Sequence, residues 1–105
     1  MQQRQSNSNV RVRTKVGIKE PKKHKVLIFN DDETPFDFVL VVLKVVFFID
    51  LDTARQIAND AMENDKAVVG EYTMDIARSK VAKATQMATA FGFPLKFEIE
   101  KDEDK

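Results

Sequence analysis

The spacing of apolar residues divides the middle of this chain into six predicted elements. Residues 24–30 form a short run of β-branched and aromatic side chains bounded by polar turn residues, which predicts a buried strand. Residues 66–72 are similar in composition and predict a second strand. Residues 95–100 alternate strictly between apolar and charged side chains, so we expect a third strand that is exposed on one face.

The segment after the first strand is apolar almost throughout, over residues 36–48, and is longer than a typical strand. Start signals favour a helix. Thr34 can act as the N-cap, Pro35 suits the first helical position and Asp37 would complete a capping box. A helix that is apolar nearly all round should be buried on several sides or present an apolar surface to a partner.

The next two predicted helices each carry one apolar stripe at helical spacing. Asp50 or Asp52 caps the first of them, and Thr73 caps the second. Gly92 and Pro94 are expected to end the second helix. The stripes consist of Ala54, Ile57, Ala58, Ala61 and Met62 in the first helix, and of Ala77, Val81, Ala84, Ala88 and Phe91 in the second.

The resulting order, β-α-α-β-α-β, predicts a single α+β domain. Three helices would cover one face of a three-stranded, largely antiparallel sheet. We place this core domain at residues 24–100. Residues 1–23 contain few large apolar groups and are expected to form a disordered basic arm, and residues 101–105 an acidic tail.

Composition narrows the function classes. The chain has no cysteine, so a disulfide, a thiolate metal site and a thiol nucleophile are excluded. With a single histidine and no glycine-rich phosphate loop, we expect no enzyme activity, no metal and no cofactor. No segment approaches the roughly 18 apolar residues of a membrane span, and residues 1–23 lack the apolar core of a secretory signal. We expect a cytoplasmic monomer without a membrane partner.

The net charge of zero conceals an asymmetry. Residues 1–23 carry seven Lys or Arg residues against one glutamate, which leaves an excess of acidic groups on the rest of the chain. A basic arm can tether nucleic acid, but this one lacks aromatic residues for stacking, and the acidic domain would repel phosphate. A protein partner for the arm is therefore the expected alternative, with no nucleic acid bound.

The candidate chemistry lies at residues 30–35, between the first strand and the first helix. Asn30, Asp31 and Asp32 supply one carboxamide and two carboxylates beside two apolar runs. Acceptor groups next to an apolar floor suit a small cation that carries an apolar side chain, such as the free N-terminus of a protein beginning with a bulky residue. A plain turn between a strand and a helix is the alternative that these six residues leave open.

Residues 25–39, KVLIFNDDETPFDFV, resemble the ClpS adaptor family. The similarity extends over residues 24–100 with nearly gapless spacing. It implies an adaptor without catalysis of its own, which captures proteins whose first residue is Leu, Phe, Tyr or Trp. Such an adaptor passes them to the N-terminal domain of a AAA+ unfoldase, ClpA or ClpC, coupled to the ClpP peptidase. Further support comes from Lys66-Ala67-Val68-Val69-Gly70, Tyr72-Thr73, Ser79-Lys80-Val81-Ala82 and Phe93-Pro94-Leu95.

The resemblance also implies residue roles. Asn30 and Asp31 would bind the substrate's α-amino group, with Asp32 at the same rim. Lys80 would contact the unfoldase, although an exposed helical lysine is usually only solvated. Without the family, most of the implied pocket residues would be interpreted as ordinary core positions. The implied side-chain pocket consists of Thr34, Phe36, Val39, Ala58, Ala61 and Leu95.

Four positions depart from the family pattern. Met62 stands where the family has a histidine that helps hold the amine, and it also completes an apolar stripe as a packing residue would. Phe36 and Ala58 replace two pocket methionines, and Phe48 replaces a glycine. A degenerate adaptor, which docks on the unfoldase but binds N-termini weakly or not at all, is therefore a second hypothesis. A third hypothesis is a relative of the ribosomal stalk protein's C-terminal domain, and the polar residues 30–32 argue against it.

Overall fold

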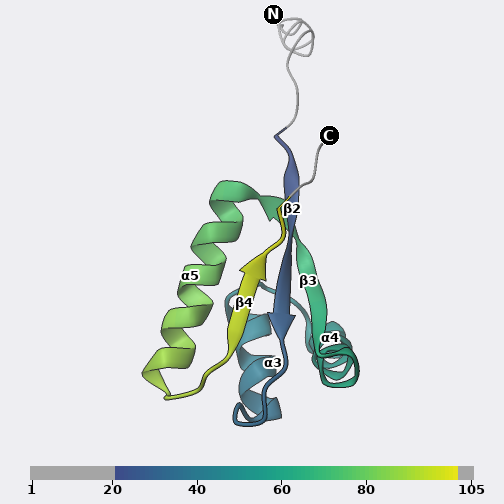
Figure 1. Cartoon of the computed structure of the whole chain (residues 1–105), viewed down its shortest axis with the longest axis vertical. Coiled ribbons are helices and arrows are strands. Elements are labelled where there is room, and N and C mark those ends of the chain that lie inside the picture. The colour runs from purple at the N-terminus through teal and green to yellow at the C-terminus, as the bar shows by residue number, and fades with distance from the viewer. Residues whose placement is uncertain (1–20, 102–105) are drawn as a thin grey trace, which may run out of the picture.

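The computed structural model describes residues 21–101 and has the expected order of elements (Figure 1). Most of the predicted disordered arm, residues 1–23, and of the predicted acidic tail, residues 101–105, lies outside the described residues. The arm was predicted to extend too far, because Lys23 already belongs to the first strand. The elements are β2 (Lys23–Phe29), α3 (Phe36–Val45), α4 (Leu51–Asn64), β3 (Lys66–Thr73), α5 (Met74–Ala90) and β4 (Lys96–Ile99).

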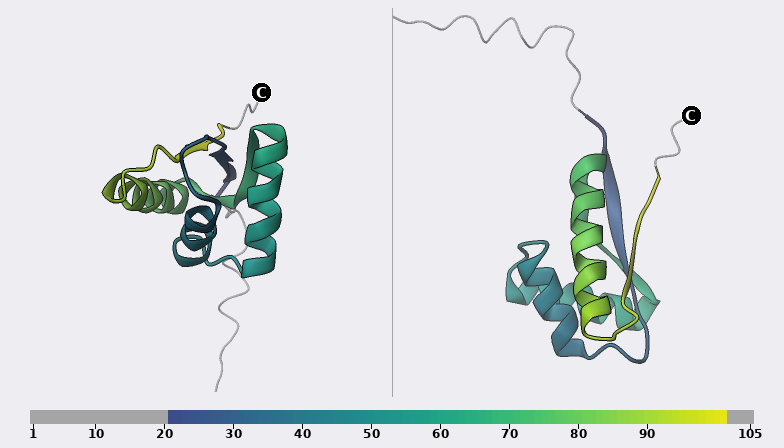
Figure 2. Two further views of the ribbon diagram at one scale, coloured as in Figure 1. Left: turned by 90° about the horizontal axis from the view of Figure 1, so that it is seen from below. Right: turned by 90° about the vertical axis from the view of Figure 1, so that its left-hand side faces the viewer.

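The three strands form one sheet in the order β3-β2-β4, and both pairings are antiparallel. This confirms the predicted α+β class. Val26 in the central strand pairs with Gly70 on one side and with Ile99 on the other. The helices gather on one side of the sheet (Figure 2). The central strand is therefore covered, and Val26 and Ile28 are almost completely buried in the core.

Helix α5 contributes mainly alanines to the core, since Ala77, Ala84 and Ala88 are all buried. Such small side chains allow a helix to approach a sheet closely. Helix α3 contributes large residues instead, and both Val42 and Leu43 are fully inaccessible. The part of this apolar run that forms α3, Phe36–Val45, is thus a helix that is buried on more than one side, as its pattern predicts.

The start of α3 differs from the expectation by one residue. The N-cap is Pro35, without a side-chain capping bond, and the helix begins at Phe36. The Thr34 hydroxyl does not cap the helix because it donates to the Asp31 carboxylate, at 2.7 Å. The prediction of a capping box at Thr34 was therefore wrong, and the Thr34 hydroxyl stabilises the preceding turn.

The end of α3 also differs, because the helix stops at Val45 and not at Phe48. Phe48 adopts a left-handed backbone with φ of 57°, and the Ile49 N–H donates to the Leu43 carbonyl. This reversal leads the chain into α4, whose N-cap is Asp50. An L-amino acid is strained at positive φ whereas glycine is not, which gives a physical reason for glycine at the corresponding position of the family pattern.

Two of the predicted boundaries follow from local capping chemistry. The Asp50 carboxylate accepts a hydrogen bond from the Thr53 N–H. Hydrogen bonding to Thr53, first through its side chain and then through its N–H, lowers the pKa of Asp50. After α5, Gly92 has φ of 80°, and the Phe93 N–H donates to the Ala88 carbonyl at 2.9 Å. The Gly92 N–H also donates to the Thr89 carbonyl at 3.0 Å. The two bonds form a Schellman motif, so Gly92 ends the helix as predicted.

Candidate functional site

A turn organised by Asp31 connects β2 to α3. One carboxylate oxygen of Asp31 accepts from the Glu33 N–H at 2.8 Å and from the Thr34 N–H at 2.7 Å. The Thr34 hydroxyl donates to the same carboxylate. The preceding residue, Asn30, is fixed by its N–H, which donates to the Asp65 carbonyl at 2.9 Å. The polar segment is therefore held by hydrogen bonds from within the protein.

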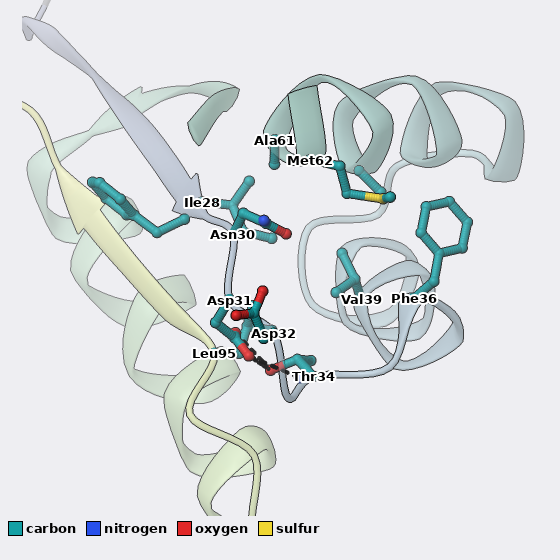
Figure 3. Close-up of a pocket in the computed structure, with 12 residues that line it drawn as sticks. Ile28, Asn30, Asp31, Asp32, Thr34, Phe36, Val39, Ala61, Met62 and Leu95 are labelled. Atoms are coloured by element: carbon teal, nitrogen blue, oxygen red, sulfur yellow. Dashed lines mark hydrogen bonds between the residues drawn. The ribbon is translucent and has the colours of Figure 1, made fainter. Parts of the chain in front are cut away.

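This turn forms one wall of a pocket with a volume of about 280 Å³ (Figure 3). The other walls come from α3, from α4 and from the residue that precedes β4. All ten residues expected at the peptide site lie around this one pocket, although they come from distant parts of the sequence. The lining consists of Ile28, Phe29, Asn30, Asp31, Asp32, Thr34, Phe36, Val39, Ala58, Ala61, Met62 and Leu95.

The floor of the pocket is apolar. Ile28 and Leu95 are buried, and Val39 is half-buried on α3. Ala58 and Ala61 are buried on α4, and their small side chains leave the interior open between α4 and β2. A dry cavity of about 150 Å³ is enough to hold benzene. The pocket therefore has room for a bulky aliphatic or aromatic side chain.

One side of the mouth is polar. The side chains of Asn30 and Asp32 are exposed, and the Asp31 carboxylate is partly accessible beside them. The Asn30 amide lies at the edge of the open space in Figure 3. Together these groups offer hydrogen-bond acceptors and negative charge, and none of the described lining residues is Lys, Arg or His. A small cation is the ligand group that such a rim favours.

The opposite side of the mouth is apolar. Phe36 from α3 is 36% exposed and Met62 from α4 is 56% exposed. Their side chains point toward one another on this side of the pocket in Figure 3. A thioether accepts hydrogen bonds only weakly, so Met62 adds apolar surface here and little capacity to hold an amine.

Two lining residues, Ile28 and Phe29, were not named from the sequence as pocket residues. Both belong to β2, the strand that leads into Asn30. The only feature of the sequence that could have indicated their place in the pocket is their position directly before the polar segment. Strand residues point alternately to opposite faces, so which of them reaches the pocket depends on how the strand ends, and the sequence leaves that open.

Lys80 lies away from this pocket, on α5. Its Nζ donates to the Val46 carbonyl at 3.1 Å and lies 4.6 Å from the centre of the Phe48 ring. The lysine is thus held against the corner between α3 and α4 and is not simply solvated. Around it is a shallow hollow lined by Val45, Val46, Phe48, Ile76, Ser79, Lys80 and Lys83.

Within residues 21–101, no three His, Cys, Asp or Glu side chains gather as they would around a metal ion. None of the helices in that range is long and apolar enough to cross a membrane.

Comparisons with known proteins identify the family. The family model for the ATP-dependent Clp protease adaptor protein ClpS matches residues 19–98. The Clp protease adapter protein ClpS of Leptospira biflexa is 43% identical over 88 residues, 84% of this chain and 78% of that protein. ClpS of Acetivibrio thermocellus is 45% identical over 86 residues, 82% of this chain and 87% of that protein.

A solved structure extends the similarity to the fold. Agrobacterium tumefaciens ClpS2 bound to L-phenylalaninamide matches with a TM-score of 0.75 at 43% identity. The match covers 79% of this chain and 100% of that one. The small α+β domain carries an amphiphilic pocket at its surface. The chain belongs to the ClpS family of Clp protease adaptors and thus to the machinery of protein degradation.

Proposed function

We propose that this protein captures substrate proteins through a free N-terminus whose first residue is Leu, Phe, Tyr or Trp. The observation that carries the proposal is the pairing of an apolar floor with the acceptors Asn30, Asp31 and Asp32 at one pocket mouth. The side chain of the first residue occupies the floor, and the α-ammonium group binds the acceptors. The protein itself performs no catalysis.

The ligand of the A. tumefaciens relative supports this assignment. That protein was solved with L-phenylalaninamide, a molecule with a free amine, an aromatic side chain and an amide. These are the three groups that the first residue of a protein chain offers. Carried over to this chain, the amine lies at the Asn30 side of the mouth and the ring lies above Ala58 and Ala61.

Delivery is the second half of the proposal. The captured protein passes to the N-terminal domain of a ClpA- or ClpC-type unfoldase and is degraded by ClpP in the cytoplasm. Lys80 is the proposed contact, because its ammonium group is held at a fixed place beside the exposed ring of Phe48. The protein acts as a monomer in this scheme, with no nucleic acid involved.

Peptide titrations test the capture step. Peptides that begin with Phe, Leu, Trp or Tyr should bind, and N-acetylated copies should bind about tenfold to 150-fold more weakly, since acetylation removes a charged hydrogen-bonding group. Asp32→Asn removes a rim charge without breaking a bond of the turn and should also weaken binding. Asp75→Asn on α5 makes the same change in charge elsewhere and is the control. Equal affinity for free and acetylated peptides contradicts the proposal.

A degenerate adaptor is the second candidate function. Two lining residues favour a degenerate adaptor. Met62 supplies no good hydrogen-bond acceptor, and Phe36 narrows the mouth of the pocket with its ring. This candidate predicts that the protein binds the unfoldase domain through the Lys80 surface while no free N-terminus binds in the pocket. Measuring both interactions on the same preparation separates the two functions.

A further inference from the structure

The apolar side of the mouth, formed by Phe36 and Met62, is not needed to hold a first residue. The interior of the pocket is already lined by buried or half-buried apolar residues. Phe36 and Met62 remain substantially exposed at its edge, from two different helices. Their apolar surface therefore faces a part of the ligand that lies outside the pocket.

The geometry of an amino acid identifies that part. The α-carbon of the first residue carries an ammonium group, a side chain and a carbonyl that continues the chain. The acceptors of Asn30, Asp31 and Asp32 fix the first of these, and the apolar floor fixes the second. The carbonyl must leave in the remaining direction, toward open solvent and the wall opposite the acceptors. That wall is the pair of Phe36 and Met62 (Figure 3).

We propose that Phe36 and Met62 bind the side chain of the substrate's second residue and make this protein select for a large apolar residue there. The inference rests on the proposed function, because it takes the first residue to be bound in the pocket. The ligand class thereby becomes narrower: a free N-terminus with a bulky apolar residue at position 1 and an apolar residue at position 2.

Charge around the mouth strengthens the selection. Two carboxylates line the pocket, Asp31, which is partly accessible, and Asp32, which is exposed. No cationic side chain is among the described residues that line the pocket. A glutamate at position 2 would therefore lose contact with water beside an apolar wall and face carboxylates of its own sign. Acidic second residues are the ones this mouth disfavours most.

The test compares peptides that share a first Phe and differ only at position 2, with Leu, Ala or Glu, by fluorescence anisotropy. Burial of one methylene group is worth about fourfold in affinity. The partly covered Leu side chain should therefore bind about three- to tenfold more tightly than Ala, and Glu should bind most weakly. Moving the Leu to position 4 should abolish its advantage.

Variants assign the preference to the wall. Met62→Ala and Phe36→Ala should each reduce the ratio of Leu to Ala affinities, and Met62→Lys should improve the Glu peptide relative to the Leu peptide. Val41→Ala removes a similarly exposed apolar side chain of α3 outside the pocket and should change none of these ratios. Melting curves confirm that each variant is folded.

The outcomes are distinct. If free N-terminal Phe binds and its acetylated copy does not, but position 2 has no influence, the inference is overturned and the proposed function stands. A position-2 preference that survives all three wall variants overturns it as well. If no free N-terminus binds, the proposed function fails first, and the inference fails with it.

Discussion

The Asp31 turn offers the sharpest test of how this site is built. Its carboxylate takes part in the bonds to the N–H groups of Glu33 and Thr34 and to the Thr34 hydroxyl. The same group is proposed to bind the substrate's ammonium. Asp31 should therefore support both the stability of the fold and the affinity for peptide, and two substitutions can separate these roles.

Asp31→Ala removes the acceptor for every bond of the turn. Hydrogen bonds to a charged group contribute about 1.5–3 kcal/mol each when buried. Because this carboxylate is only partly buried, we expect a total loss of about 2–3 kcal/mol. For a domain of this size, a loss of that order lowers the melting temperature by roughly 10–20 °C. The fold should survive, since small domains are stable by about 5–15 kcal/mol.

Asp31→Asn retains an amide oxygen that can accept the two backbone bonds, but it removes the negative charge. It should recover much of the stability lost in Asp31→Ala while binding peptide almost as poorly. Thr34→Val removes only the hydroxyl bond at 2.7 Å and should cost about 1 kcal/mol with a small effect on affinity. Thermal melts and peptide titrations on all three variants measure both quantities. If Asp31→Asn binds peptide like the parent protein, the charge does not act on the ammonium and the reasoning is refuted.

Three further predictions follow from other parts of the chain. Met62→His replaces apolar wall surface with a nitrogen acceptor at the mouth, and it should tighten binding of free N-termini by up to about 2 kcal/mol while lowering the ratio of Leu to Ala affinities at position 2; unchanged affinity in titrations would mean that position 62 faces only the second residue and does not reach the amine. Deleting residues 1–20 should leave peptide affinity and melting temperature nearly unchanged while abolishing unfoldase-dependent degradation of a model substrate; delivery at the parental rate would contradict this role. Phe48→Gly should leave stability unchanged or raise it by up to about 1 kcal/mol in thermal melts, because it relieves a positive φ at a residue that is 80% exposed. Phe47→Ala, at the buried neighbour, should cost about 3–5 kcal/mol, and a similar loss in Phe48→Gly would refute the argument.

Local chemistry made much of this fold predictable from the sequence. The alternation of residues 95–100 predicted a strand, and β4 lies at Lys96–Ile99 within it. Asp50 was one of two predicted caps, and it accepts a bond from the first turn of α4. Gly92 was expected after the last helix and has the positive φ that glycine adopts without strain. Each of these predictions depends on neighbours within a few residues.

The polar half of the site was also visible in the sequence, since Asn30, Asp31 and Asp32 are adjacent and their acceptor chemistry does not depend on the fold. The ring of residues around the pocket was different. Leu95 and Ala58 were named from the family resemblance alone, and periodicity would have placed them in an ordinary core. Only the packing of α4 and the segment before β4 against the turn brings them to one cavity.

Tertiary structure decided the remaining features, because they depend on contacts that periodicity does not encode. Thr34 would cap α3 in isolation, but Asp31 competes for its hydroxyl, so the helix begins one residue later than expected. Phe91 was assigned to a buried stripe, yet it is largely exposed, and its ring packs against Phe38 with a centroid distance of 5.3 Å. The sequence by itself determined which groups could bind an amine and where the elements lie. The fold decided that an apolar floor stands beside those groups, since cavity shape is a property of elements packed together from distant parts of the chain.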